Sequence, residues 1–237
     1  MSDSVGMDRR LAAVAEGTAA AALHHELGAL ALADERRRAL GLFLRHLARG
    51  ERIAERIAGR QVALAPDARA ARFFRSQARQ ERLHARVFDM AAGWLHAGCD
   101  VPRDPYDAYE QRLQRQAERG DYAETVVGTQ IVLEALGEVL LARLECGLAR
   151  SGAGFRTLRR MMLAQEATHH AFGRAAIASM LEAGALAAPL IDAHVATYRR
   201  LAQPMIAAAA PVLRHFALTA DDIANDLDTR LRDAAST

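Results

Sequence analysis

The chain has 237 residues, with 31 basic and 29 acidic side chains and a formal net charge of +2. This length can bury a sizeable core, and the mixed charge offers no long basic block of the kind that binds nucleic acid. Cys99 and Cys146 are too few for a disulfide framework, and we expect no membrane span. Ala, Leu, Arg and Glu dominate and aromatic residues make up 5%. We therefore expect a soluble, cytoplasmic, all-α protein that forms a single domain over residues 1–237.

The first predicted elements are an Ala-rich helix over residues 8–31 and a long helix over 34–64. Glu51 and Glu55 lie on or beside the apolar stripe of the long helix. A carboxylate buried without a partner costs several kcal/mol, so such a residue needs a cationic side chain or a metal ion. The arginines nearest in sequence are the alternative partners: Arg49, Arg52 and Arg56.

A second long helix is predicted over residues 68–95, after a Pro-Asp turn in which Asp67 is a good N-cap. Glu81 and His84 fall in the middle of its apolar stripe. Residues three apart share one helix face, so this carboxylate and this imidazole can reach one ion together. A single Glu-x-x-His is a weak signal, because a lone histidine on such a stripe is more often a core residue.

Residues 98–120 contain the helix breakers of the chain, and a short polar helix over 107–119 is expected to span the bundle there. The next predicted helix, 122–148, is apolar nearly all round and therefore belongs in a core. Glu134 and Glu138 stand in its middle, where charge is least welcome. Pairing with Arg143 or with an arginine of a neighbouring helix is the alternative explanation for them.

The fourth long helix is predicted over residues 155–183 and carries a second Glu-x-x-His, Glu166 and His169. His170 points away from the stripe. From residue 187 onward, three prolines predict a chain cut into pieces, with a closing helix after Thr219 that runs to about residue 232. These segments are expected to pack outside a bundle core of residues 34–184.

The two halves of this core match: a helix with an inward Glu, a turn, and then a Glu-x-x-His helix. Two Glu-x-x-His pairs, with a Glu from each of two further helices, are a common way for a four-helix bundle to hold two metal ions. The candidate ligands are Glu51, Glu81, His84, Glu134, Glu166 and His169, with Glu138 and Glu55 as candidate extras. Seven side chains could line an apolar chamber or could be plain core: Phe73, Phe74, Phe88, Trp94, Met161, Met162 and Met180.

This pattern, over roughly residues 40–180, resembles the ferritin-like di-iron carboxylate superfamily. Within it the chain is most similar to the aldehyde-deformylating oxygenases. The similarity lies in the interval from Glu51 to the Pro-Asp turn, in Ile131-Val132-Leu133-Glu134-Ala135, and in residues 165–173, which are close to a D-E-x-x-H-x-x-F-G pattern. The tRNA-modifying hydroxylases share the Leu-Glu-Ala of the third helix. Glu138 departs from both families.

The resemblance implies a ferritin-like four-helix bundle with additional N- and C-terminal helices, in which the six candidate residues hold two iron ions (Fe/Fe, or Mn/Fe). Glu81 and Glu166 would bridge them. The implied activity is an O2-dependent oxygenase or monooxygenase acting on an apolar small molecule, such as a fatty aldehyde, with electrons from an external donor such as ferredoxin. The alternatives are a ferroxidase, iron-storage or peroxide-scavenging protein, a tRNA-modifying hydroxylase, and a bundle that has lost its metals. Substrate, donor and oligomeric state stay open.

Overall fold

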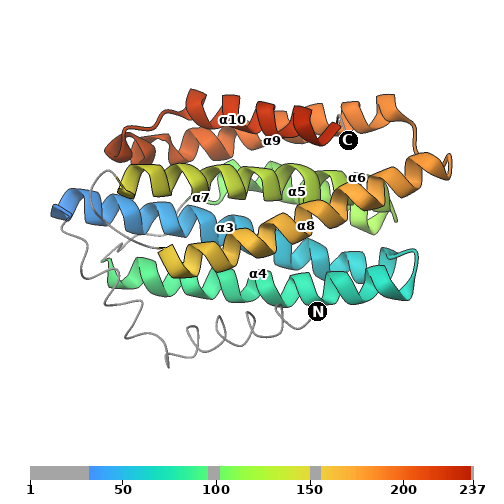
Figure 1. Ribbon diagram of the computed structural model, residues 1–237, viewed down its shortest axis with the longest axis horizontal. Coiled ribbons are helices and arrows are strands. Elements are labelled where there is room, and N and C mark those ends of the chain that lie inside the picture. Colours follow the sequence, from blue (N-terminus) through green and yellow to red (C-terminus); the bar gives the residue numbers. More distant parts are fainter. Residues whose placement is uncertain (1–31, 96–101, 150–155, 236–237) are drawn as a thin grey trace.

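The computed structural model describes residues 32–95, 102–149 and 156–235, and all their regular elements are helices (Figure 1). No strand occurs among these residues. The all-α class expected from composition is therefore confirmed for the described part of the chain. The Ala-rich helix predicted over 8–31 lies outside the described residues.

Helices α3 (Asp34–Leu64) and α4 (Ala68–Trp94) form a long antiparallel hairpin (Figure 1). Their bounds agree with the prediction to within one residue. Asp67 caps α4, since its Oδ1 accepts a hydrogen bond of 2.7 Å from the backbone N–H of Ala70. The tight turn places the Glu-bearing helix directly beside the first Glu-x-x-His helix.

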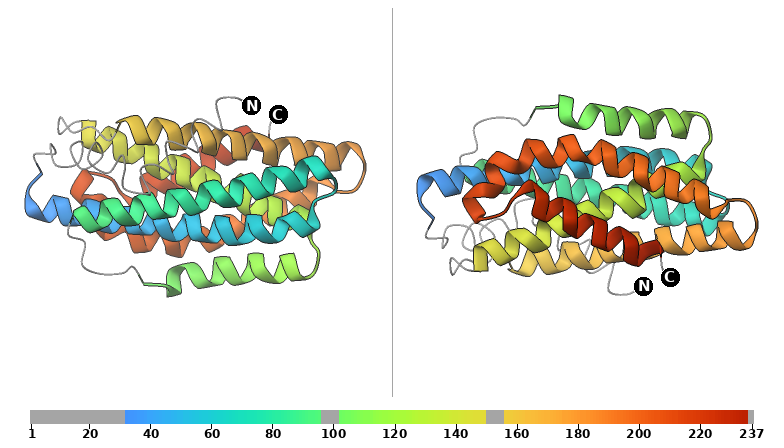
Figure 2. Two further views of the ribbon diagram at one scale, coloured as in Figure 1. Left: turned by 90° about the horizontal axis from the view of Figure 1, so that it is seen from below. Right: turned by 90° about the horizontal axis from the view of Figure 1, so that it is seen from above.

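Helix α5 (Asp104–Glu118) runs back along the hairpin, so the next helical segment starts at the same end of the molecule as α4 (Figure 2). The helix begins three residues earlier than predicted. Its first turn contains Asp104 and Pro105, and the fixed φ of proline suits that position.

The third segment consists of α6 (Tyr122–Val126), the π-helix η1 (Val127–Leu133) and α7 (Glu134–Ala149). The stretch Tyr122–Leu144 is long and apolar enough to cross a membrane, and 89% of its apolar window is buried inside the molecule. Helix α8 (Arg156–Glu182) lies along this segment. A plain α-helix was predicted here, and the π-helical turns just before Glu134 are a difference that the sequence pattern does not mark.

A close approach of α8 to the π-helix holds the third segment in place. A Cβ atom added to Gly173 of α8 would lie 2.6 Å from Cβ of Gln130 and 3.3 Å from its backbone carbonyl carbon. Only glycine allows the two helices to approach this closely, so this contact fixes the position of the residues that lead into Glu134.

Helix α9 (Ala188–Leu213) is one continuous element, and the prediction of a segment cut into pieces is wrong. Pro204 and Pro211 lie inside the helix, although an interior proline removes a backbone hydrogen bond and costs about 3 kcal/mol. The buried side of α9 packs against α5, η1 and α3, and this packing compensates for the lost bonds. Pro189 sits in the first turn, where proline favours a helix start.

The chain closes with a 3-10 turn, η2 (Arg214–Phe216), and helix α10 (Ala220–Ala235). Thr219 and Asp222 cap α10 reciprocally, because the Thr219 N–H donates to Oδ2 of Asp222 and the Asp222 N–H donates to Oγ1 of Thr219. Helices α9 and α10 cover one side of the four long segments (Figure 2).

Candidate metal centre

The six predicted ligands meet in the middle of the molecule. Each of the four long helical segments supplies part of the set, and every member is buried, with an exposed fraction between 0 and 9%. They form two groups that share Glu81. The first group is Glu51, Glu81, His84 and Glu166, and the second is Glu81, Glu134 and His169. Within each group the potential ligand atoms lie within 4.8 Å of one another, so each group could hold a metal ion.

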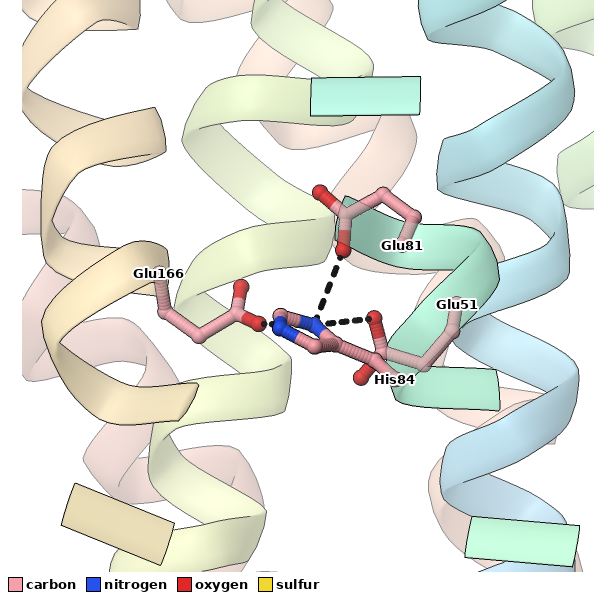
Figure 3. Close-up of side chains that lie close together, drawn as sticks. All are labelled: Glu51, Glu81, His84 and Glu166. Carbon is pink, nitrogen blue, oxygen red and sulfur yellow. Dashed lines mark ion pairs between the residues drawn. The ribbon is translucent and has the colours of Figure 1, made fainter. Parts of the chain in front are cut away.

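His84 is the centre of the first group (Figure 3). Its Nδ1 atom lies 3.1 Å from Oε2 of Glu81, 3.1 Å from Oε1 of Glu166 and 3.4 Å from Oε2 of Glu51. Three carboxylates from three different helices therefore surround one imidazole nitrogen.

His169 occupies the corresponding place in the second group. Its Nδ1 atom lies 2.9 Å from Oε1 of Glu81, 3.5 Å from Oε2 of Glu134 and 3.9 Å from Oε2 of Glu166. Glu81 thus directs one oxygen toward each histidine, and Glu166 does the same. This is the arrangement of two carboxylates that can each bridge two ions.

Several of these atoms have no hydrogen-bond partner although they are close together. They are Nδ1 of both histidines, both carboxylate oxygens of Glu81, and Oε1 of Glu166. Buried polar atoms are nearly always hydrogen-bonded, so it is unusual that several potential metal-binding atoms without hydrogen-bond partners lie close together. Atoms so placed fit metal ions, and a mixed carboxylate and imidazole set without cysteine suits iron or manganese.

Two glutamines support the histidines from behind, and each reaches across the centre. Nε2 of His84 lies 2.7 Å from Oε1 of Gln165, and Nε2 of His169 lies 2.8 Å from Oε1 of Gln80. An amide oxygen only accepts, so in each case Nε2 carries a proton and Nδ1 is the nitrogen that faces the carboxylates. The sequence pattern does not reveal this role, although a glutamine precedes the Glu of both motifs.

A chain of buried glutamines orients Glu134. Nε2 of Gln77 donates to Oε1 of Glu134 at 2.6 Å, Nε2 of Gln130 donates to Oε1 of Gln77 at 2.9 Å, and Nε2 of Gln61 donates to Oε1 of Gln130 at 3.0 Å. All three glutamines are fully buried. The carboxylate of Glu134 is therefore tied to the π-helix and to α3 and α4.

The cluster shares protons in the absence of metal. Burial and the neighbouring carboxylates raise the pKa of Glu51 and of Glu134 well above the usual range. Burial also acts upward on Glu81, but the two histidines outweigh it and hold its pKa at about 2. Burial would lower the pKa of His84 and of His169, yet the surrounding carboxylates raise both well above 6.5. Protons then supply the positive charge that four carboxylates need.

The arginines considered as alternative partners of Glu51 point elsewhere. Arg49 and Arg56 pair with Glu110, and Arg52 pairs with Asp89. The charged partner of Glu51 among the described residues is His84. Pairing with a nearby arginine is therefore rejected for this carboxylate.

The two candidate extras do have arginine partners. Glu55 lies 2.7 Å from Nε of Arg82 at the surface, and Glu138 pairs with Arg230 of α10. Neither belongs to a group that could hold a metal ion. Each therefore has a cationic partner of its own, and their role as additional ligands stays an untested prediction. His170, expected behind the site or at the surface, is buried.

A third group of potential ligands, Asp121, Glu124 and His194, has a different explanation. Nε of Arg112 lies 2.6 Å from Oε1 of Glu124, and Tyr198 donates a hydrogen bond of 3.2 Å to the same oxygen. A guanidinium already balances this carboxylate. The group is therefore an ion pair that joins α5, α6 and α9.

A cavity opens beside the cluster on the side of α9. Its walls include three of the predicted ligand carboxylates, those of Glu51, Glu134 and Glu166, and are otherwise mainly aliphatic. Helix α9 contributes Met205, Ile206 and Ala209. The remaining lining residues are His46, Leu47, Gly50, Ala54, Tyr106, Leu133, Leu136, Gly137 and Leu140. Of the aromatic and methionine residues suggested from the sequence, those whose side chains the structure describes do not line it, and the side chain of Met161 lies outside the described part. Phe74, Phe88 and Met162 are core residues, and Phe73 stacks on Phe172.

No protein-family model matches the chain, and no curated protein matches it significantly. The resemblance to di-iron carboxylate proteins therefore stays a prediction from its motifs, and the geometry of the buried cluster is the independent observation that bears on it.

Proposed function

We propose that the protein is a member of the ferritin-like di-iron carboxylate superfamily and an O2-dependent oxidoreductase. Two iron ions would be held by the six residues Glu51, Glu81, His84, Glu134, Glu166 and His169. The observation that carries the proposal is the position of Glu81 and Glu166, each with one oxygen toward each of two buried imidazoles. An Arg-neutralised or solvent-facing set of acids would not be arranged in this way.

When bound, the iron pair would supply the reduction of O2, with electrons from an external donor. The part played by the chain is to hold and orient this centre. Glu81 and Glu166 would each offer one oxygen beside each histidine, Glu51 and Glu134 would complete the set of residues that hold the iron pair, and Gln165 and Gln80 would keep Nδ1 of the two histidines available. The path of α5 along the hairpin and the pairing of α3 with α4 and of α7 with α8 support the ferritin-like assignment.

The adjoining cavity favours the oxidation of a small organic molecule over iron storage. Three ligand carboxylates are reached from a chamber whose other walls are mainly aliphatic. An iron-storage centre needs a polar route by which many hydrated ions enter, whereas an apolar chamber suits an organic substrate and keeps water away.

Metal loading tests the proposal directly. The purified protein is loaded with ferrous iron without oxygen, desalted, analysed for metal, and then exposed to O2 while oxygen uptake is measured. We expect about two iron ions per chain and oxygen uptake without growth of an iron mineral. Glu51→Gln should lose iron, while Glu55→Gln, on the same helix but outside the cluster, should not. Less than one iron per chain would overturn the metal centre, and a growing mineral would favour a ferroxidase.

A further inference from the structure

The cavity beside the cluster contains one polar pair that no ligand role explains. Nδ1 of His46 on α3 and the hydroxyl oxygen of Tyr106 on α5 lie 2.6 Å apart in a buried hydrogen bond. Both residues line the cavity, together with Glu51, Glu134 and Glu166 of the cluster. The remaining walls are aliphatic or glycine. The chamber therefore has two polar regions, the ligand carboxylates and this pair.

The pair keeps one hydrogen-bond donor that the bond between its two members does not use. A neutral imidazole carries one N–H and the tyrosine one O–H, and the hydrogen bond between them uses one of the two. In one tautomer the N–H at Nε2 of His46 is left over, and in the other the O–H of Tyr106 is. No other side chain of the described residues is hydrogen-bonded to either group. Either way, one donor remains for a molecule in the chamber.

The pair is uncharged at neutral pH. Burial lowers the pKa of His46 to about 4. Burial also raises the pKa of Tyr106, against the opposing effect of Arg49. A carboxylate ligand would find no Arg or Lys side chain in the cavity lining, so the end of the chamber at His46 and Tyr106 suits a neutral hydrogen-bond acceptor.

Two glycines keep the chamber open. Gly50 and Gly137 line it, and a Cβ added to either would meet no heavy atom within 4 Å. The space open to water-sized molecules is about 40 Å³. That is room for about three water-sized groups, so a short aliphatic body fits, and a longer one would require the side chains of Met205 and Ile206 to move.

We infer that this chamber binds a short, uncharged, mainly aliphatic molecule with one oxygen acceptor, an alcohol or a carbonyl compound, and that His46 and Tyr106 hold that oxygen. As the substrate class of the enzyme, the inference rests on the proposed function. His46 and Tyr106 are then residues that select and position the substrate, whose aliphatic body extends toward Glu51, Glu134 and Glu166.

Calorimetric titration of the purified protein before iron loading tests the inference with alkan-1-ols of two to eight carbons, the matching alkanoates, and the matching 1-chloroalkanes as apolar probes. We expect the shorter alcohols to bind and the alkanoates not to bind. The double variant His46→Phe/Tyr106→Phe, which removes both possible donors, should weaken alcohol binding about three- to tenfold, the effect of one neutral hydrogen bond, and leave chloroalkane binding unchanged. Gly137→Leu should abolish both, because it fills the chamber.

Tyr198→Phe is the matched control, since it removes a buried tyrosine hydroxyl outside the cavity. Alkanoates that bind as well as alcohols, alcohol binding unchanged in the double variant His46→Phe/Tyr106→Phe, or binding that survives Gly137→Leu would each overturn the inference. Because titration needs no turnover, it is independent of the metal-loading experiment. Alcohol binding in a protein that takes up no iron would support the ligand class while the proposed function fails.

Discussion

Nε2 of His84 lies 2.7 Å from Oε1 of Gln165, although 81 residues separate the two along the chain. The reciprocal contact joins His169 to Gln80 at 2.8 Å. Each Glu-x-x-His motif therefore supplies a carboxylate to the buried cluster, and the glutamine before it supplies an amide that supports the histidine of the other motif. The two motifs depend on each other, which explains why both must be present on facing helices.

The first prediction concerns these glutamines. Gln165→Leu removes the acceptor behind His84, so the imidazole is free to rotate and to change tautomer. Loss of such a supporting contact typically lowers metal affinity about 10- to 100-fold. Competition with a calibrated chelator should show one weakened ion and one unchanged ion. Gln114→Leu on α5, outside the cluster, should bind both ions as the wild type does, and equal weakening of both ions in Gln165→Leu would contradict the crossed arrangement.

Metal loading should release protons. Burial is the main cause that raises the pKa values of Glu51 and Glu134, and the facing carboxylates raise those of His84 and His169, so the cluster binds protons more tightly without metal than free side chains would. Coordination requires the deprotonated forms, so protons should leave as the two ions bind. Titration calorimetry in buffers of different ionisation enthalpy gives the number of protons released.

The directions of these pKa shifts also determine how metal affinity and the stability of the metal-free protein change with pH. Metal affinity should fall as the pH is lowered, since more protons must be displaced. Without metal, the stabilisation from the raised pKa values is full at low pH and is lost as the pH rises through them, so the metal-free protein should be less stable in alkali. Proton release near zero, or an affinity that does not depend on pH, would contradict this account of the cluster.

Two glutamates on α7 provide a third prediction. Glu134 faces the cluster, whereas Glu138 pairs with Arg230. Glu134→Gln should reduce bound iron because it replaces an anionic ligand by an amide. Glu138→Gln should keep both ions and lose about 1–2 kcal/mol of unfolding free energy, because it breaks an ion pair with one buried member. Metal analysis and chemical denaturation of both variants decide the assignment, which fails if Glu138→Gln is the one that loses iron.

Local pattern was sufficient to predict the helices around the site. The helical period of the apolar residues, the Asp67 cap and the proline-containing turn predict the bounds of α3 and α4 to within one residue. The position of a carboxylate on an apolar stripe identifies Glu51 and Glu134 as buried acids. The pattern could not give partners from distant helices. Arg230 lies 92 residues after Glu138, and nothing local shows that it, rather than a metal ion, balances that carboxylate.

The chamber was beyond sequence reasoning for the same reason. Its polar pair joins His46 to Tyr106 across 60 residues, and part of its wall comes from α9, whose prolines predicted a broken segment. Packing of α9 outweighs the local cost of Pro204, and that balance depends on tertiary contacts that the sequence pattern does not contain.

The last prediction concerns the contact between α8 and the π-helix. Gly173→Ala places a methyl group 2.6 Å from Cβ of Gln130 and 3.3 Å from its backbone, so α8 and the π-helix must move apart. We expect a loss of about 1–3 kcal/mol of unfolding free energy, the usual cost of overpacking. Because Gln130 donates to Gln77 and Gln77 to Glu134, iron affinity should fall as well.

Gly59→Ala on α3 is the control, since its methyl group meets nothing within 4 Å and alanine favours a helix. Denaturant midpoints and iron affinities of both variants test this. Equal stability of Gly173→Ala and wild type would show that the close approach does not hold the π-helix in place.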